Sequence, residues 1–427
     1  MSTAPAASTA RAPAPGFSSD QRFMVAMLAF LQFTIVLDFM VLSPLGALLM
    51  PALAISPRQF GLVVSVYAIA AAVSGILAAG FADRYDRKKF LLFFYAGFVL
   101  GTVFCGLAPT YPTLLAARIV TGLFGGVVGA AAYAIVADVF PLTMRGRVMG
   151  LIMSAFAASS VLGIPIGIFL ATHFGWHAPF LMIAGVALAV GVVIVLRMPP
   201  VDTHLQETRH QNPARHLWKT ATSSHYWVGF AATMLLTTGG FMLMPFASAF
   251  TVNNQHITLD RLPILYAITG GCSLIFGPLI GRLSDRFGKY AMFCATSSLV
   301  IVVVLYYTQL ENAPLWLMIL VNVVMFACVT GRMTAAGALT SAVPGPLDRG
   351  AYMSISSSLQ QMAGGIASYL AGLLVYQAPS GRMEHYPRIG LAVSVATVLT
   401  MLLMYRVHRL VAESAPAQAA GEVLAGG

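Results

Sequence analysis

The sequence predicts an all-α membrane protein with twelve transmembrane helices in two pseudo-symmetric six-helix bundles. Of its 427 residues, 58% are hydrophobic and only 9% are charged, whereas a soluble domain carries roughly 25% charged residues. Such a chain cannot cover a water-exposed surface, so lipid must surround it. Apolar runs of spanning length, roughly 20 residues, occur about twelve times. A charged, turn-forming segment also occurs twice at half-chain distance, which is typical of a duplicated membrane bundle.

The repeated segment lies between two long apolar runs in each half of the chain. The first copy, residues 79–89, reads Ala-Gly-Phe-Ala-Asp-Arg-Tyr-Asp-Arg-Lys-Lys, and the second, residues 281–289, reads Gly-Arg-Leu-Ser-Asp-Arg-Phe-Gly-Lys. A second match follows in each half, where Pro141-Leu-Thr-Met-Arg145-Gly146 corresponds to Pro344-Gly-Pro-Leu-Asp-Arg349-Gly350. Each of these segments follows a Gly/Ala-rich helix and opens the next one. The matches predict six helices in each half.

The apolar runs divide the chain into two bundles, residues 20–198 and 225–411, joined by a polar cytoplasmic linker, residues 199–224. We expect residues 1–19 and 412–427 to be disordered cytoplasmic tails. Closed barrels also span membranes, but their strands alternate in polarity and are about half as long. The predicted spans are Arg22–Leu49, Arg58–Phe81, Phe90–Ala108, Tyr111–Phe140, Met144–Phe174, His177–Met198, Tyr226–Phe250, Leu259–Leu283, Tyr290–Gln309, Ala313–Val343, Tyr352–Gln377 and Tyr386–Leu410.

The net charge of +10 is explained by the distribution of Lys and Arg. About eighteen of these residues lie in the tails and in every second loop, about four in the opposite loops, and two inside the membrane, as the positive-inside rule describes. This asymmetry places both termini in the cytoplasm and the protein in the plasma (bacterial inner) membrane. It also argues against a nucleic-acid partner. The first run is long enough to span and lacks the order of a cleaved signal peptide.

Several chemistries find no support in the sequence. All four cysteines lie inside apolar runs, without metal-ligand spacing or a disulfide framework. There is no phosphate-binding Gly-Lys-Ser/Thr loop, no His-x-x-x-His pair and no convincing nucleophile elbow. We therefore expect no enzymatic activity, no cofactor and no metal.

Asp38 is the only acidic residue that the sequence places deep in the bilayer. A carboxylate there costs about 2.5–3.5 kcal/mol on insertion scales. Desolvation favours its neutral form, so the group could load and release a proton. Two interpretations remain open. Asp38 either carries protons during transport or is a fixed ion-pair partner of Arg118 that never titrates.

Two basic residues, Arg118 and Arg332, also fall within predicted spans. A buried guanidinium stays charged and needs an anion, carbonyl groups or a wet cavity. Arg332 could bind a polar or anionic substrate group, or it could snorkel and pair locally. By the spacing of the repeat, Asn322 occupies the place that Arg118 holds in the first half. Arg332, Asn322 and Tyr133 are the candidates for a central substrate cavity.

At these residues the chain resembles the major facilitator superfamily over nearly its whole length. The family's loop between the second and third helices reads roughly G-x-x-x-D-R-x-G-R-K. Here Ala79 and Asp86 replace its two glycines, whereas the second copy keeps both, as Gly281 and Gly288. Asp tolerates turn conformations better than most residues.

Two further motifs are similar to the drug:proton antiporter branch, in particular to its arabinose-, sugar- and nucleoside-efflux-like permeases. One is Arg118 followed by Gly122, Gly125 and Gly126. The other, on the fifth helix, is Gly163-Ile-Pro165-Ile-Gly167, followed by Gly175-Trp176-His177. His177 departs from the Arg that these permeases usually carry there. Asp38 likewise resembles the acid in the first helix of such antiporters.

The resemblance implies roles for these residues. Arg118 would set the protonation of a nearby acid, and Gly163, Pro165 and Gly167 would pack the fifth helix closely and limit leak. The charged loops would join the two halves in one conformational state, with Asp138 placed to pair with Arg87. The alternative is that these loops are only a topology signal. The implied gating residues are Asp83, Arg84, Arg87, Asp138, Asp285 and Arg286.

The function expected from these observations is secondary active transport by alternating access. The direction would be export of a small organic solute (a drug, a sugar or a nucleoside-like metabolite) driven by inward proton movement, by a monomer in the lipid bilayer. One rival is a proton-coupled importer of a metabolite. Another is a non-transporting receptor or scaffold, which would call for a large extramembrane region that these short polar connectors do not provide.

Overall fold

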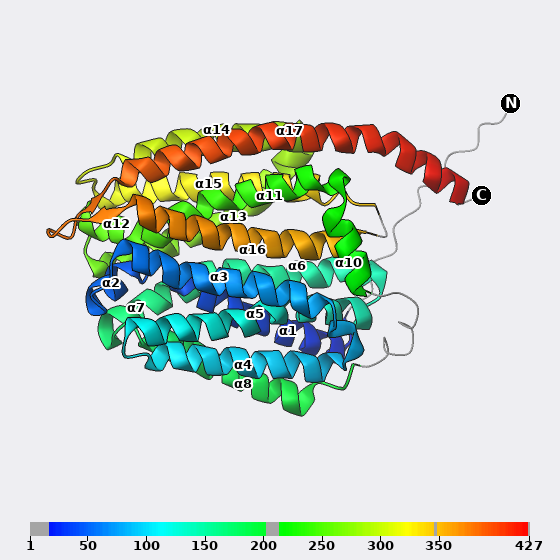
Figure 1. Ribbon diagram of the computed structural model, residues 1–427, viewed down its shortest axis with the longest axis horizontal. Coiled ribbons are helices and arrows are strands. Elements are labelled where there is room, and N and C mark those ends of the chain that lie inside the picture. The colour runs from blue at the N-terminus through cyan, green and yellow to red at the C-terminus, as the bar shows by residue number, and fades with distance from the viewer. Residues whose placement is uncertain (1–16, 202–212, 346–347, 426–427) are drawn as a thin grey trace.

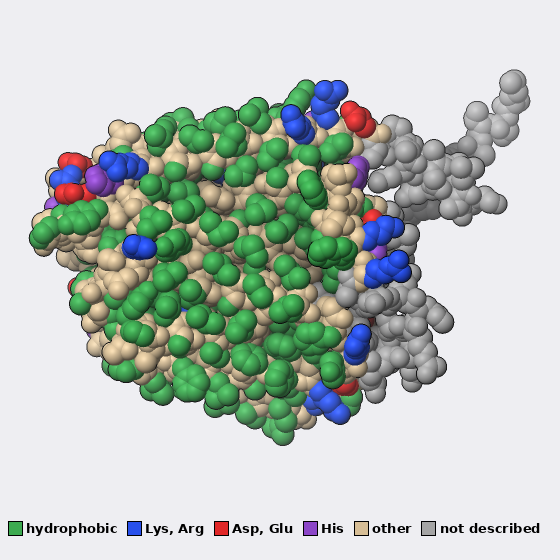
Figure 2. Space-filling view, viewed as in Figure 1, with side chains coloured by type: hydrophobic (Ala, Val, Ile, Leu, Met, Phe, Trp, Pro, Cys, Tyr) green, Lys and Arg blue, Asp and Glu red, His purple; other side chains and the backbone are tan. Residues whose placement is uncertain are grey.

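The protein is a bundle of helices that run side by side along its long axis (Figure 1). The computed structural model describes residues 17–201, 213–345 and 348–425. The end where α1 begins and α17 finishes is called here the termini end, and the opposite end is the far end. An apolar belt covers the side seen in Figure 2, while Lys and Arg side chains gather at the termini end and a mixed charged group lies at the far end. This distribution is that of a protein embedded in lipid.

The first half contains the helices from α1 to α8. A π-helical turn, Ser159–Gly163, joins α6 to α7, so together they form the fifth span. A 3₁₀ turn, Ala82–Arg84, lies in the loop before α4. The helices are α1 (Ser19–Val41), α2 (Gly46–Ala52), α3 (Pro57–Ala79), α4 (Arg87–Leu107), α5 (Tyr111–Val139), α6 (Leu142–Ala158), α7 (Ile164–Phe174) and α8 (Ala178–Arg197).

The second half contains the helices from α11 to α17, preceded by the linker helix α10. Short 3₁₀ turns, Met244–Phe246 and Leu259–Arg261, lie between the helices. A small antiparallel hairpin, β1 (Tyr376–Gln377) and β2 (Met383–Glu384), lies at the far end. The helices are α10 (Pro213–Thr222), α11 (Ser224–Leu243), α12 (Ala247–Asn253), α13 (Leu262–Phe287), α14 (Lys289–Thr308), α15 (Leu315–Thr340), α16 (Arg349–Leu374) and α17 (Tyr386–Ala425).

Within the described residues, eleven helical segments are long and apolar enough to cross a membrane. The helix α16 is not among them, although it has 26 residues and lies alongside the others (Figure 1). Its serines and its two glutamines, Gln360 and Gln361, make it less apolar than the other spans. It packs along α3 of the first half, so a neighbouring protein surface, rather than lipid, covers much of it.

The first helix of each half is broken in the same way. Pro44 follows α1 and precedes α2, and Pro245 follows α11 and precedes α12. Proline cannot continue a helix without loss of a backbone hydrogen bond. The short helices α2 and α12 each have seven residues. Matching Pro44 with Pro245 also aligns α2 with α12 over their full lengths, which fixes the register between the halves.

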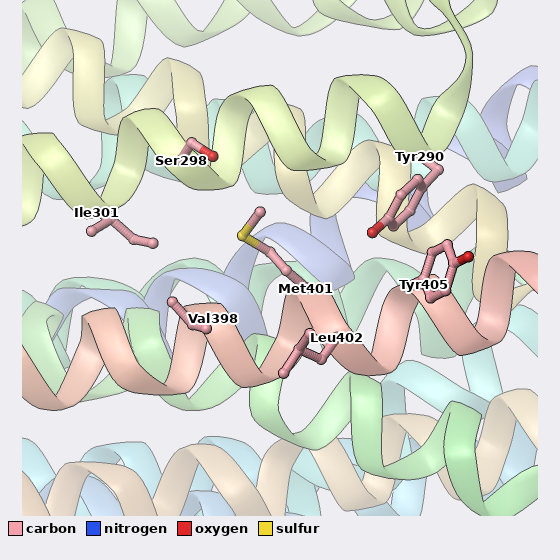
Figure 3. A pocket seen from close by; sticks show the side chains of 7 residues that line it. All are labelled: Tyr290, Ser298, Ile301, Val398, Met401, Leu402 and Tyr405. Carbon is pink, nitrogen blue, oxygen red and sulfur yellow. The ribbon is translucent and has the colours of Figure 1, made fainter.

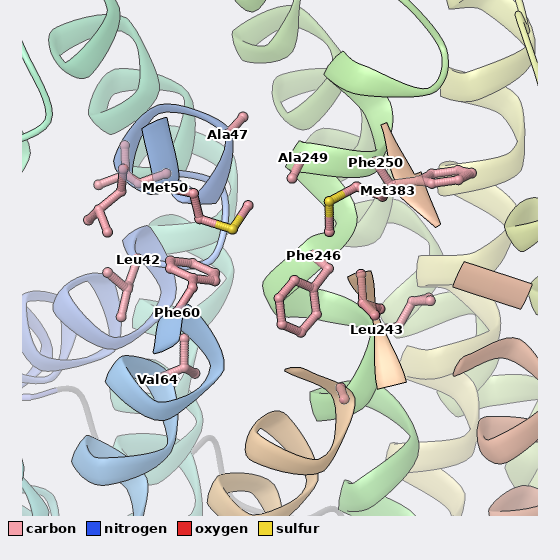
Figure 4. Packing of buried hydrophobic residues seen from close by; sticks show 14 of the residues in the cluster. Leu42, Ala47, Met50, Phe60, Val64, Leu243, Phe246, Ala249, Phe250 and Met383 are labelled. Atoms are coloured by element: carbon pink, nitrogen blue, oxygen red, sulfur yellow. The ribbon is translucent and has the colours of Figure 1, made fainter. Parts of the chain in front are cut away.

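Two apolar clusters join the halves, and the smaller one packs Met40, Ile164 and Ile168 of the first half against Leu262 of the second. The larger cluster combines residues of both halves, including Leu42 and Phe60 from the first and Phe246 and Phe250 from the second. Figure 4 shows Phe60 and Phe246 facing each other across the boundary, with their ring centres 5.9 Å apart. Toward the termini end, each half has a separate cluster of its own. The halves are therefore packed together at the far end.

Two regions differ from the sequence-based expectation. The linker contains the helix α10, whose Leu217 packs against the apolar core of the second half; residues 202–212 lie outside the described part. The last helix, α17, continues to Ala425, where a disordered tail was expected from residue 412. Alanines, which favour helix, are frequent in that segment. Of the tail predicted for residues 1–19, residues 1–16 lie outside the described part.

Candidate functional site

A buried ion pair lies inside the first half, between α1 and α5. Arg118 Nη1 donates a hydrogen bond to Asp38 Oδ2 at 2.8 Å, and both residues are 0% exposed. The hydroxyl of Thr102, on α4, donates to Asp38 Oδ1 at 3.3 Å. Two opposite charges that leave water together are stabilised only when their geometry is good and their remaining polar atoms are bonded. Both oxygens of Asp38 have a partner, although Thr102 shares its one hydroxyl proton with Phe98 O, and Arg118 Nε has no partner among the described residues.

Aromatic rings connect this ion pair to the second half. The guanidinium carbon of Arg118 lies 4.3 Å from the centre of the Tyr67 ring, on α3. The ring of Phe39, which follows Asp38 in the chain, lies 5.4 Å from that of Tyr67 and 5.5 Å from that of Phe241, on α11. A cation over an aromatic face is attracted by its quadrupole. A change in the position of Arg118 can therefore displace Tyr67 and Phe39, and through them Phe241 of the second half.

Glycines on α5 bring α3 close enough to make this contact. A Cβ atom on Gly122 would lie 2.4 Å from the carbonyl oxygen of Tyr67, and one on Gly126 would lie 2.4 Å from that of Ala71. Any side chain at these positions would collide with the backbone of α3. The glycines that follow Arg118 in the sequence thus hold Tyr67 against it.

The fifth-helix motif packs directly beside Asp38. A Cβ atom on Gly163 would lie 2.4 Å from Leu37 Cδ1, and one on Gly167 would lie 2.6 Å from Val41 Cγ2. Leu37 and Val41 are both on α1 and flank Asp38. Pro165 closely follows the π-helical turn Ser159–Gly163 inside the fifth span, where a proline interrupts the helical hydrogen bonds. The motif seals one side of α1 at the level of the carboxylate.

The charged loop of the first half is organised by hydrogen bonds at the termini end. Arg87 Nε lies 2.8 Å from Asp138 Oδ2, so the pairing expected from the sequence is present, while its gating role stays a prediction. Asp86 accepts from the backbone N–H of Lys89 at 2.8 Å, which caps α4, and from that of Val201 at 3.1 Å. The substitution of a family glycine by Asp86 therefore adds a helix cap and a contact to the chain after α8.

The other gating candidates whose side chains are described are exposed to solvent. Arg84 is exposed, and Asp285 and Arg286 are exposed at the end of α13. Arg286 lies over the ring of Phe287, 5.5 Å from its centre. The side chain of Asp83 lies outside the described part of the chain.

The three substrate-cavity candidates do not form one cluster. Arg332 and Asn322 are both buried on α15, and the amide of Asn322 donates to Met318 O of its own helix at 2.8 Å. Arg332 Nη1 donates to Thr397 Oγ1, on α17, at 3.2 Å. Tyr133 is half-buried in the core of the first half. Of the three, Arg332 alone makes a described side-chain hydrogen bond to another helix of the bundle.

A groove of about 570 Å³ lies between α14 and α17 (Figure 3). Tyr290, Met401 and Tyr405 line it together with aliphatic side chains. Tyr405 and Leu402 are exposed on the outside of the bundle. The groove is therefore on the lipid-facing surface and is not part of the site around Asp38.

Sequence reasoning did not find Thr102. The only signal was a hydroxyl within an apolar run, and such hydroxyls usually bond to their own helix, as Thr102 also does to Phe98 O at 3.0 Å. Its second contact, to Asp38, depends on how α1 and α4 pack, which the sequence does not state.

Comparison with known proteins identifies the family of the chain. The sequence profile of the Major Facilitator Superfamily matches residues 28–251 and 229–425. The uncharacterized MFS-type transporter YceJ of Bacillus subtilis (strain 168) is 26% identical over 387 residues, which cover 88% of this chain and 94% of that protein. The methylenomycin A resistance protein of Streptomyces coelicolor is 30% identical over 216 residues, covering 50% of this chain and 45% of that protein.

The fold is also found among solved structures. A bacterial homolog to the human lysosomal transporter Spinster, in an inward-facing and unoccupied conformation, matches with a TM-score of 0.74 at 16% identity. The match covers 93% of this chain and 99% of that one.

Proposed function

The chain belongs to the Major Facilitator Superfamily and is therefore a membrane transporter that works by alternating access; we propose that it exports a small organic solute in exchange for protons. The observation that carries this proposal is the ion pair between Asp38 and Arg118, buried within the first half. Of the acidic side chains that the structure describes, Asp38 alone is buried. A proton-coupled carrier needs one such group that can gain and lose a proton.

Protonation of Asp38 would remove the charge that holds Arg118. A neutral carboxyl keeps a hydrogen bond but loses the charge–charge attraction, which is strong where water is excluded. The guanidinium would then retain only the Tyr67 ring and a weaker bond. Because Phe39 and Tyr67 lie between the pair and Phe241 of the second half, the loss would loosen contacts between the halves. This is how proton uptake would bias the conformational equilibrium.

Three observations support export. The fifth-helix motif resembles that of the drug:proton antiporter branch, and its glycines pack against Leu37 and Val41 beside Asp38. A tight seal at that level would prevent protons from leaking without solute. One of the relatives is named as a resistance protein. The alternative is proton-coupled import. It would use the same residues, but proton and solute would cross the membrane in the same direction.

We further propose that both termini are cytoplasmic, that the protein lies in the bacterial inner membrane, and that it faces inward here. Most of the basic residues gather at the termini end, as the positive-inside rule describes. The larger apolar core that joins the two halves is at the far end, while the cores toward the termini end are separate. A carrier that is closed on the outside, and whose apolar cores are distinct on the inside, would load solute from the cytoplasm; α3 and α16 stay in contact as far as Gly75 and Ser358.

The test is Asp38→Asn in proteoliposomes, with a solute first found because it stabilises the purified protein against heat. Asn keeps the shape and a hydrogen-bond acceptor but cannot titrate. We expect loss of uphill export driven by a pH gradient, with solute binding and downhill exchange retained. Thr102→Val is the matched control, because it removes the 3.3 Å bond to Asp38 and leaves the ion pair.

Stability must be measured in parallel, because breaking a buried pair destabilises a protein by about 3–5 kcal/mol. The double variant Asp38→Asn/Arg118→Gln removes both charges and should recover part of the lost thermal stability. If a folded Asp38→Asn variant still concentrates solute with the wild-type pH dependence, the pair is structural and the coupling group lies elsewhere, with Asp138 the first to test.

A further inference from the structure

Arg332 is a buried cation whose charge has no described counter-ion. It is 3% exposed, and its only described side-chain hydrogen bond runs from Nη1 to the hydroxyl of Thr397 at 3.2 Å. Its Nε and Nη2 atoms are both buried and have no hydrogen-bond partner among the described residues. A guanidinium cannot shed its proton in a protein. Leaving it buried without an anion is therefore strongly unfavourable.

The two free donors lie on the same edge of the guanidinium plane. With Nη1 occupied, the N–H groups of Nε and Nη2 remain, and these point in nearly parallel directions. Two parallel donors match the two oxygens of a carboxylate, which is the strongest common pairing of arginine. The vacant edge of Arg332 therefore has the geometry of a carboxylate receptor.

Internal symmetry shows which group is missing. The register that matches Pro44 with Pro245 and α2 with α12 places Asp38 opposite Gly239. The guanidinium of Arg332 lies beside this position. Its Nη1 atom, which donates to Thr397, and Thr397 Oγ1 would each be 3.9 Å from a Cβ atom on Gly239. In the first half an arginine on the fourth helix meets a carboxylate on the first helix. In the second half the corresponding helices bring an arginine to a glycine.

A small side chain would fit at Gly239, and the space around Gly240 is open. A Cβ atom on Gly239 would make only ordinary contacts, the shortest being 3.4 Å to Val393 Cγ1. The next residue, Gly240, is exposed and has no atom within 4 Å of where its Cβ would lie. In the register above it corresponds to Phe39, whose ring fills this level of the first half.

We propose that Arg332 binds the carboxylate of an organic-acid substrate, which supplies the counter-ion that Gly239 cannot. This inference rests on the proposed transport function and specifies its substrate class. In this proposal the first half binds the proton and the second half binds the substrate. In the first half a protein carboxylate, Asp38, neutralises Arg118 and exchanges protons. In the second half a substrate carboxylate neutralises Arg332.

The first experiment supplies the missing carboxylate from the protein itself. Gly239→Asp should raise the thermal unfolding temperature above that of Gly239→Asn, because the new carboxylate can reach Arg332. In an Arg332→Gln background the order should reverse, since the carboxylate would be buried without a partner. Gly240→Asp is the matched control, with the same added charge one residue away. If Gly239→Asp lowers the unfolding temperature as much as Gly240→Asp does, the guanidinium of Arg332 does not accept a carboxylate from this side and the proposal is wrong.

The second experiment measures ligand binding on the purified protein. The probes are benzoate and gluconate, with benzamide and glucose as neutral counterparts of similar size. At least one acid should raise the unfolding temperature of the wild type more than its neutral counterpart does. The shift should disappear in Arg332→Gln and in Gly239→Asp, where the site is already filled, and persist in Gly240→Asp. A shift that survives in Arg332→Gln, or no shift with either acid in the wild type, would overturn the proposal.

These measurements need neither a proton gradient nor transport. A negative result in these two experiments would reject the organic-acid site at Arg332 but not proton-coupled export. A negative result in the Asp38→Asn experiment would reject Asp38 as the coupling group but not the organic-acid site.

Discussion

Replacing Gly372 with alanine should open the far end of the protein. Gly372 lies on α16 where this helix touches the start of α3, and a Cβ atom there would lie 2.8 Å from Pro57 O and 3.1 Å from Arg58 Cα. Both of these atoms belong to the backbone and cannot rotate away. Ser56 caps α3 and Pro57 occupies its first turn, so the start of the helix is rigid and would have to move as a body.

The size of the effect follows from this overlap. Overpacking a close-packed contact destabilises it by about 1–3 kcal/mol. Applied only to the state in which α3 and α16 touch, that range changes the ratio of open to closed molecules by roughly 5- to 150-fold. The gain in helix propensity from Gly to Ala, about 1 kcal/mol, acts in both states and does not alter their ratio.

The assay is a distance distribution from electron paramagnetic resonance between spin labels at Ala52→Cys and Ser380→Cys, one in each half at the far end. The four native cysteines, Cys105, Cys272, Cys294 and Cys328, must first be replaced. Gly372→Ala should increase the population at long distance. Gly350→Ala is the control, because it lies on the same helix and has no atom within 4 Å of its Cβ position. Identical distributions for the two variants would refute the view that close glycine packing holds the far end shut.

Two further predictions concern the termini end. A reporter fused at Lys219 should behave as cytoplasmic and one fused at Thr110 as external, because the basic residues are distributed as the positive-inside rule describes; finding both on one side would contradict the twelve-helix topology. Asp83→Asn should slow transport in vesicles while leaving membrane insertion intact, because the lost charge weakens contacts made in only one conformational state; an unchanged rate would make the loop a topology signal only.

Sequence patterns predicted the parts of this protein that depend on local polarity. Apolar runs located the spans, and the intramembrane charges Asp38, Arg118 and Arg332 were visible because charges are rare in lipid. The family resemblance also led to the expectation that Asp138 pairs with Arg87, and the two side chains are in contact. Each of these features could be recognised from the type of one residue and its position within or at the end of an apolar run.

What the sequence could not supply was the contact geometry between helices. The fit of Gly126 against Ala71, the hydrogen bond from Thr102 to Asp38, and the approach of Arg332 to Gly239 each depend on the rotation and separation of two helices. The spacing of the repeat aligned Asn322 with Arg118, yet Arg332 reaches the level that corresponds to Asp38, since a long side chain can extend far from its own Cα. Pro165 indicated that the fifth span is disturbed, but not that the disturbance takes the form of a π-helical turn, Ser159–Gly163.

The polar character of α16 has a consequence for how the chain is made. During synthesis a helix partitions from the translocon into lipid according to its apolar content, and the serines, Gln360 and Gln361 make this step unfavourable for α16. Its close partner, α3, belongs to the half that is synthesised first, and presents Ser65 and the backbone at Gly61 to Gly365 and Ser368. We therefore expect α16 to be stabilised in the membrane by α3, so that the second half assembles fully only when the first half is present.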